Sequence, residues 1–133
     1  MKIIGDVITR MLLVDNKREI LAPIIYFIDD KVLIVRRGDI TDFASIPWFA
    51  RWYVDNDTDN VVYASIIHDL IHVNEGWVDG HYFTLAQADR IFMDICIDQG
   101  MNRFVAFTLY LSLRAYWVSG IGYAVRYIEK KLK

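Results

Sequence analysis

The spacing of the apolar residues changes once along the chain, and this change limits the fold more than any other feature. In the first forty residues, runs rich in β-branched and aromatic residues alternate with short turn sequences, which is typical of strands. Segments 3–14 and 20–28 predict two strands joined by a turn at 15–17, and 31–36 predicts a third. After Pro47 the pattern becomes helical. The sequence therefore predicts an α+β fold.

The helical part divides into several segments at its loop and capping sequences. Thr84 and Gln87 form a capping box, in which each side chain can satisfy the backbone N–H of the other residue. This box predicts that a helix begins there and ends near Gly100. The predicted helices cover 48–53, 58 or 59 to about 73, 84–100 and 102–118, with a loop over 74–83.

The length of 133 residues is that of one domain. We expect 1–133 to be a single domain, mainly β over 1–40 and mainly α over 47–133. In it, a small N-terminal antiparallel β-sheet packs on a C-terminal bundle of about four helices. Hydrophobic residues make up 55% of the chain, which is enough for a core and excludes a disordered polymer.

The charged residues and the cysteine exclude several classes of protein. The net charge of −2 provides no basic surface for duplex nucleic acid. Cys96 is the only cysteine, so no internal disulfide can form, which fits a reducing compartment. Lys2, Asp6 and Arg10 interrupt any signal-peptide core. Arg114 interrupts the longest apolar stretch, so a buried helix is expected there, with membrane contact as the minor alternative.

Two histidines stand four residues apart on the second predicted helix. This spacing allows His68 and His72 to bind one metal ion. At about 100° per residue, the face expected in the core contains Tyr63, Ile66, Ile67 and Leu70. The opposite face contains Val61, Ala64, Ser65, His68 and His72. A polar stripe facing solvent is the ordinary interpretation of that face, but its small residues also allow another element or a ligand to approach His68.

Asp89 lies at the edge of the apolar face of the helix over 84–100. A carboxylate in that position needs partners, because burying an unpaired charge is costly. We predict that Asp89 is largely buried and bonded, either in an ion pair with Arg36, Arg37 or Arg114 or in a functional site. We also predict that Asp42, His68, Asp69 and Asp89 converge in space, although they come from three segments.

The segment 41–47 connects the predicted sheet to the helices. The ordinary interpretation is that Asp42 holds a turn, Ser45 caps a helix and Pro47 occupies its first turn. A second interpretation makes Ser45 a nucleophile that acts with His68 and an aspartate. The aromatic residues that follow can stack on a sugar or a base of a substrate, and they are Trp48, Trp52 and Tyr53.

Three segments together resemble a known family. Thr-Asp-Phe-Ala-Ser-Ile-Pro at 41–47, His-Asp-Leu-Ile at 68–71 and Ala-Asp-Arg-Ile-Phe at 88–92 are similar in order and spacing to the phage and prophage family catalogued as domain of unknown function 1353. The resemblance implies a tailed phage or prophage source. At position 72 the family pattern has an aromatic residue such as Tyr, which argues against a two-histidine metal site as shared chemistry. The pattern carries over to Asp42, Ser45, Pro47, His68, Asp69 and Asp89.

Our first functional hypothesis is a small hydrolase acting on phosphodiester or cell-wall bonds. His68 would be the general base or a metal ligand, Asp69 or Asp42 would orient it, and Asp89 would be a second acid or ligand. A divalent metal ion, if used, would bind His68, His72 and Asp89. The alternative is a non-enzymatic virion or tail accessory, or a counter-defence protein that binds a host protein or nucleotide, in which the cluster is structural.

Two further expectations concern location and assembly. We expect the cytoplasm of the infected bacterial host, with the virion as the alternative location. The predicted helix over 102–118 is apolar on nearly all sides, so it is expected to be central or to lie at an interface. Self-association through the C-terminal helices is therefore predicted.

Overall fold

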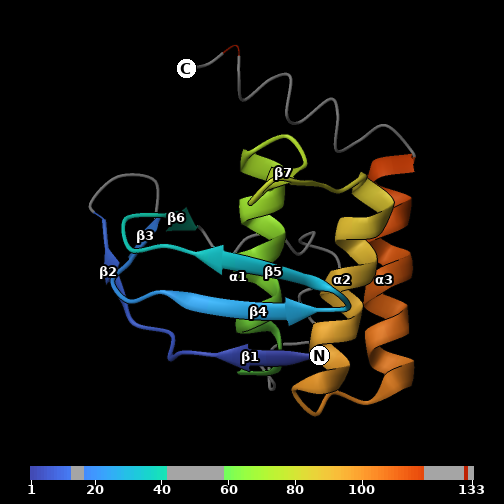
Figure 1. The fold of residues 1–133 in the computed structure, drawn as a ribbon. Coiled ribbons are helices and arrows are strands. Elements are labelled where there is room, and N and C mark those ends of the chain that lie inside the picture. The colour runs from blue at the N-terminus through green and yellow to red at the C-terminus, as the bar shows by residue number, and fades with distance from the viewer. Residues whose placement is uncertain (13–16, 42–58, 119–130, 132–133) are drawn as a thin grey trace.

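The computed structural model describes residues 1–12, 17–41, 59–118 and 131. Strands fill most of the N-terminal part and helices most of the C-terminal part, which confirms the α+β class (Figure 1). The strands are β1 (Lys2–Ile4), β2 (Thr9–Met11), β3 (Arg18–Ile20), β4 (Ile24–Ile28), β5 (Lys31–Val35), β6 (Ile40–Thr41), β7 (Trp77–Val78) and β8 (His81–Tyr82). The helices are α1 (Asp59–Val73), α2 (Leu85–Asp98) and α3 (Arg103–Val118).

Within the described ranges the helices number three, so the predicted bundle of about four is not matched. These three agree closely with the predicted segments, and the short helix expected over 48–53 falls outside the described residues. The capping box at the start of α2 is confirmed. The N–H of Gln87 donates to Oγ1 of Thr84 at 3.1 Å, and the N–H of Thr84 donates to Oε1 of Gln87 at 2.9 Å.

The N-terminal strands form two small antiparallel sheets instead of the single predicted sheet. Their orders are β1-β4-β5 and β2-β3-β6. Two of the predicted strands are each divided between these sheets, at Gly5 and at Pro23. Gly5 has a φ of +119°, and a Cβ there would lie 2.6 Å from the carbonyl oxygen of Pro23. Only glycine allows this approach, so the chain turns from one sheet into the other at this point.

The segment expected as a loop over 74–83 contains a β-hairpin, which corrects the prediction. Strands β7 and β8 pair in register through Trp77 with Tyr82 and Val78 with His81. The two-residue turn between them is Asp79-Gly80, and both residues have positive φ, at 49° and 79°. Asp-Gly is the sequence that this tight hairpin turn favours, so the signal was present in the sequence.

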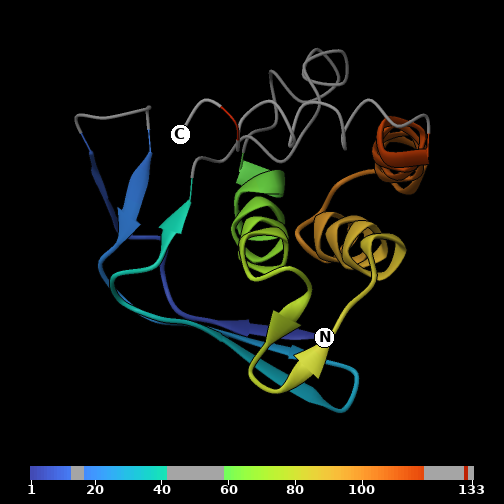
Figure 2. The ribbon, with the colours of Figure 1, turned by 90° about the horizontal axis from the view of Figure 1, so that it is seen from above.

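Helix α1 is the central element of the fold. Figure 2 shows the strands bending around it, with α2 beside it and α3 beyond α2. On the strand side, the hydroxyl of Tyr26 in β4 donates to the carbonyl of Tyr63 at 2.7 Å. The hydroxyl of Tyr63 then donates to the carbonyl of Gly5 at 2.9 Å. These bonds attach the sheet of β1, β4 and β5 to the middle of α1.

The central position of α1 corrects the prediction of a single core face. Ile66 and Ile67 are buried as expected. The opposite face does not point to solvent, and α2 packs against α1 there through the contacts of Asp89 and Phe92 with His68. Four of its five residues are buried, namely Val61, Ala64, Ser65 and His68. The small side chains there allow the two helices to approach closely.

Helix α3 lies at the outside of the helical layer, although its apolar sequence led us to expect a central or interface helix. Leu109 and Leu113 are buried, whereas Phe104, Phe107 and Leu111 are exposed. Across the described part of the chain, no helix has the length and apolarity needed to span a membrane.

Candidate metal centre

The site begins with two histidines one turn apart on α1. The Nε2 atoms of His68 and His72 lie 3.3 Å from each other, and their ring centroids are 4.3 Å apart. The ring of His68 packs edge-on against Phe92 of α2, with centroids 5.5 Å apart. Packing on both sides therefore holds the His68 imidazole in one orientation.

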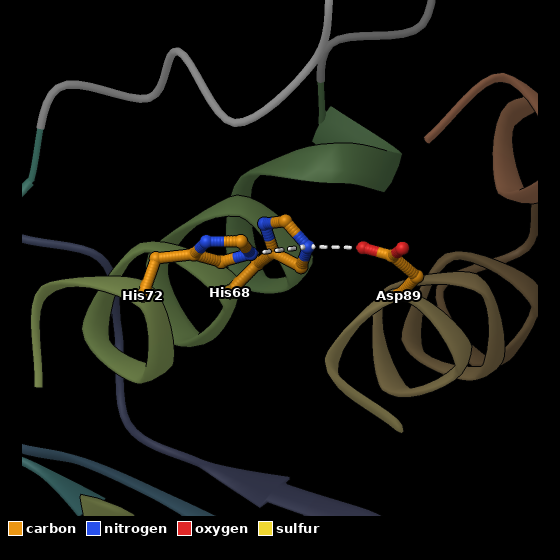
Figure 3. Close-up of side chains that lie close together, drawn as sticks. All are labelled: His68, His72 and Asp89. Carbon is orange, nitrogen blue, oxygen red and sulfur yellow. Dashed lines mark hydrogen bonds and ion pairs between the residues drawn. The ribbon is translucent and has the colours of Figure 1, made fainter. Parts of the chain in front are cut away.

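Asp89 faces these histidines from the neighbouring helix α2. Its Oδ1 lies 2.8 Å from Nε2 of His68, as the dashed line in Figure 3 indicates. Its Oδ2 accepts a hydrogen bond from Nη1 of Arg114 on α3 at 3.1 Å. Asp89 is 0% exposed and His68 is 2% exposed. The prediction of a buried and bonded Asp89 is confirmed, and Arg114 is its partner among the three arginines that were considered.

The protons available in this cluster do not satisfy all of its contacts. A neutral imidazole carries one proton, and each ring nitrogen has a single position for a proton or a lone pair. Nε2 of His68 faces two atoms at bonding distance, Oδ1 of Asp89 and Nε2 of His72. Its one proton must be shared between them, or one of the contacts brings two lone pairs together. A cation placed among the three atoms would satisfy every lone pair.

Two of the three separations between ligand atoms are close to those around a small divalent ion. The ligand atoms of His68, His72 and Asp89 all lie within 4.8 Å of one another. In a tetrahedral zinc site, with ligands at about 2.0–2.1 Å, neighbouring ligand atoms are about 3.3–3.4 Å apart. The distance of 3.3 Å between the two histidines matches this value. The contact of 2.8 Å to Asp89 is shorter, so the carboxylate must move outward by about 0.5 Å to admit an ion.

The second ring nitrogen of His68, Nδ1, takes no part in the contacts with His72 and Asp89. Among the described residues, Nδ1 of His68 is buried and has no hydrogen-bond partner. If Nε2 binds a metal ion, Nδ1 carries the proton of the ring, and metal-binding histidines usually donate that proton to an acceptor. If Nε2 keeps the proton, Nδ1 is instead a buried acceptor without a donor. This atom therefore does not favour one state of the ring over the other.

The comparisons with known proteins place the chain in a family. Residues 18–113 match the model of a family described as "Protein of unknown function (DUF1353)". The chain belongs to this family. A search of curated proteins and a search of solved structures gave no significant match. His68, His72 and Asp89 lie inside the matched range of DUF1353, and Arg114 follows directly after its end.

Asp69 of this DUF1353 chain points to a different neighbour. Its Oδ2 accepts a hydrogen bond from Oγ1 of Thr41 at 2.5 Å, at the end of β6. Asp69 thus fixes the residue that precedes Asp42 in the sequence. The predicted convergence is seen for His68 with Asp89. Five further candidates lie outside the described residues, and they are Asp42, Ser45, Trp48, Trp52 and Tyr53.

Sequence reasoning gave no functional role to two residues that contact the candidate site residues, Thr41 and Arg114. Thr41 was considered only as part of a segment, and its contact with Asp69 depends on how β6 meets α1. Arg114 was named only as one of three candidate partners of Asp89. Its sequence signal is a charge inside a mostly apolar helix whose other charged residue, Arg103, stands at the first position. A charge inside such a helix needs a partner for the same reason that Asp89 does.

Proposed function

We propose that this DUF1353 protein is a small hydrolase that depends on a divalent metal ion. The observation that carries the proposal is the convergence of three ligand atoms from His68, His72 and Asp89 around one point. Two histidines and one carboxylate leave the fourth position of a tetrahedral ion open for water, as in catalytic zinc sites. Zinc lowers the pKa of such a water to about 7, which makes hydroxide available near neutral pH.

The residues take distinct roles in this proposal. His68 and His72 bind the ion through Nε2, and Asp89 binds it through Oδ1. Arg114 holds the other oxygen of Asp89 and so fixes the orientation of the carboxylate. Asp69 positions Thr41 and thereby the start of the segment that contains Asp42 and Ser45. His68 acts as a ligand and not as a general base, because its Nε2 is the atom that faces the other two ligands.

The candidate substrates of a phage or prophage protein are phosphodiester bonds and cell-wall bonds. Hydrolysis of either consumes one water molecule. An ion held by His68, His72 and Asp89 would supply hydroxide for attack on the phosphorus or carbon atom. The bond to the leaving group would break, and the leaving group would take up a proton. The proton lost by the water passes to solvent.

A structural role is the second candidate, and one observation favours it. Asp89 is fully buried and joins residues of α1 and α3 to α2. Such a network can hold three helices together without any chemistry. The protein would then be a virion or tail accessory, or a counter-defence protein that binds a host molecule.

Metal binding is the first test. The protein is treated with a chelator, dialysed, and titrated with Zn²⁺, Mn²⁺ and Co²⁺ by calorimetry. We expect one ion per chain and a loss of affinity in His72→Ala and Asp89→Asn. His81→Ala is the matched control, since His81 lies on β8 outside the cluster and its loss should leave metal affinity unchanged. His72→Tyr introduces the aromatic residue of the family pattern. A loss of metal affinity in this variant would show that the site depends on a histidine at position 72.

Turnover is the second test. The metal-loaded protein is assayed against cyclic dinucleotides, single-stranded nucleic acid and peptidoglycan fragments. His68→Ala should lower the rate by at least about a hundredfold, which is typical for the loss of a catalytic group, while the protein stays folded. Metal binding without turnover on any substrate would make the ion structural. The network interpretation replaces both if no ion binds and His68→Ala only lowers the melting temperature.

A further inference from the structure

We propose that Arg114 binds a phosphoryl oxygen of the substrate, so that the substrate class is a phosphate ester and not a neutral cell-wall bond. This inference rests on the proposed metal site and chooses between the two substrate classes that the function leaves open. It starts from the position of Arg114 relative to Asp89.

The guanidinium of Arg114 lies on the outer side of the cluster. It reaches Oδ2 of Asp89 at 3.1 Å, and the other oxygen of the same carboxylate lies 2.8 Å from His68. One carboxylate group therefore separates the guanidinium from the proposed ion. The side chain of Arg114 is 25% exposed, whereas that of Asp89 is 0% exposed. The arginine thus lies between the buried ligand and solvent.

Arg114 keeps most of its hydrogen-bonding capacity. A guanidinium has five N–H donors in a planar fork. Within the part of the chain that the structure describes, its only hydrogen bond is the single one to Asp89. An arginine that served only to neutralise a carboxylate would more often bind it through two parallel bonds. The remaining donors of Arg114 are available to a planar or tetrahedral anion.

The charges of the site favour the same class of substrate. Asp89 and Arg114 cancel each other, and histidines that bind metal are neutral. A divalent ion then leaves a net charge of about +2 among these four residues. Asp69, the neighbouring carboxylate on α1, is bonded to the neutral hydroxyl of Thr41 and keeps its charge, so the excess is about +1 when Asp69 is counted. A phosphate ester brings the negative charge that offsets this excess, whereas amide and glycosidic bonds are neutral.

The proposed step balances without a further reactant. Hydroxide from the bound water forms a new bond to phosphorus while the ester P–O bond breaks, and the leaving oxygen takes up a proton. Arg114 contributes by donating to a non-bridging oxygen, where negative charge is held during the transfer.

The test uses zinc-loaded protein, freed of unbound metal, and inorganic phosphate as the probe. Calorimetry measures phosphate affinity in the wild type, in Arg114→Met and in Arg114→Lys. Arg114→Met should weaken phosphate binding at least about tenfold, as expected for the loss of a hydrogen bond between charged groups. Arg114→Lys keeps a positive charge but loses the planar fork, so it should lie between the two. If Arg114→Met does not fold, Arg114→Lys alone is compared with the wild type.

The control variant is Arg90→Met. Arg90 is an exposed arginine on α2 that pairs with Asp94, so its loss should leave phosphate affinity unchanged. If the wild type binds no zinc, the proposed function fails. If zinc binds but phosphate binds equally to the wild type and to both Arg114 variants, the metal site stands and the role of Arg114 is refuted.

Discussion

Replacing Asp89 by alanine tests the centre of the molecule, because this carboxylate connects all three described helices. The change removes the contact of 2.8 Å with His68 and the bond of 3.1 Å from Arg114. A hydrogen bond to a charged group contributes about 1.5–3 kcal/mol. Arg114 is partly exposed and can recover water, whereas His68 is buried and cannot. We therefore expect a loss of about 2–4 kcal/mol in the free energy of unfolding.

This loss should be visible as a change in melting temperature. For 133 residues, the entropy of unfolding is about 0.28 kcal/mol/K. A loss of about 2–4 kcal/mol then lowers the melting temperature by about 7–14 °C. The assay is thermal unfolding followed by circular dichroism, with a chelator present so that only contacts within the protein contribute.

Asp94→Ala is the matched control for this measurement. Asp94 is on the same helix, and its pair with Arg90 at 3.5 Å is exposed. Exposed pairs of this kind contribute about 0.5 kcal/mol or less, so the melting temperature should change by about 2 °C or less. If Asp89→Ala melts within about 3 °C of the wild type, the buried contacts of Asp89 do not stabilise the fold as argued.

Three further predictions concern other parts of the chain. Burial raises the pKa of the Cys96 thiol to about 12. Thiol reagents should therefore modify Cys96 only after denaturant is added. Rapid labelling of the native protein would contradict the burial of this residue. Desolvation raises the pKa of Asp79, but the hydrogen bond from the N–H of Ile34 and the ion pair with Arg36 lower it further, and the net pKa lies below the usual value. The ionised Asp79 therefore contributes to stability at neutral pH, and this contribution is lost on acidification. Asp79→Asn should be less stable than the wild type at about pH 7 and equally stable at about pH 2.5. A difference in stability that does not depend on pH would rule out this linkage. Phe104 is 77% exposed and belongs to an apolar stripe on α3; we expect concentration-dependent self-association by light scattering, abolished in Phe104→Glu, and a monomer at every concentration would exclude this interface.

The parts of the fold that depend on local sequence were predicted correctly. The capping box of Thr84 and Gln87 marks the start of α2 because both hydrogen bonds lie within one turn. The ends of α1 and α3 were also close to their predicted positions. The hairpin at Asp79-Gly80 was equally local, but a loop was predicted there. Each of its strands has only two residues, which is too short to show an alternating pattern.

The candidate site was predicted in its members but not in its arrangement. The sequence alone identified His68 and His72 by their spacing of four residues, and it identified Asp89 because a carboxylate at the edge of an apolar helix face needs partners. Their convergence depends on α2 packing against the face of α1 that was expected to meet solvent. The amphipathic pattern of one helix does not indicate whether a second helix covers its other side.

The tertiary structure alone selected Arg114 from the three arginines considered for Asp89. Arg36 pairs instead with Asp79 on the hairpin, whereas Arg114 extends from α3 to the carboxylate on α2. Charge and residue type, which the sequence determines, made each arginine an equally suitable partner. The distance between two side chains depends on how separate helices pack, and for residues 25 positions apart only the folded chain decides it.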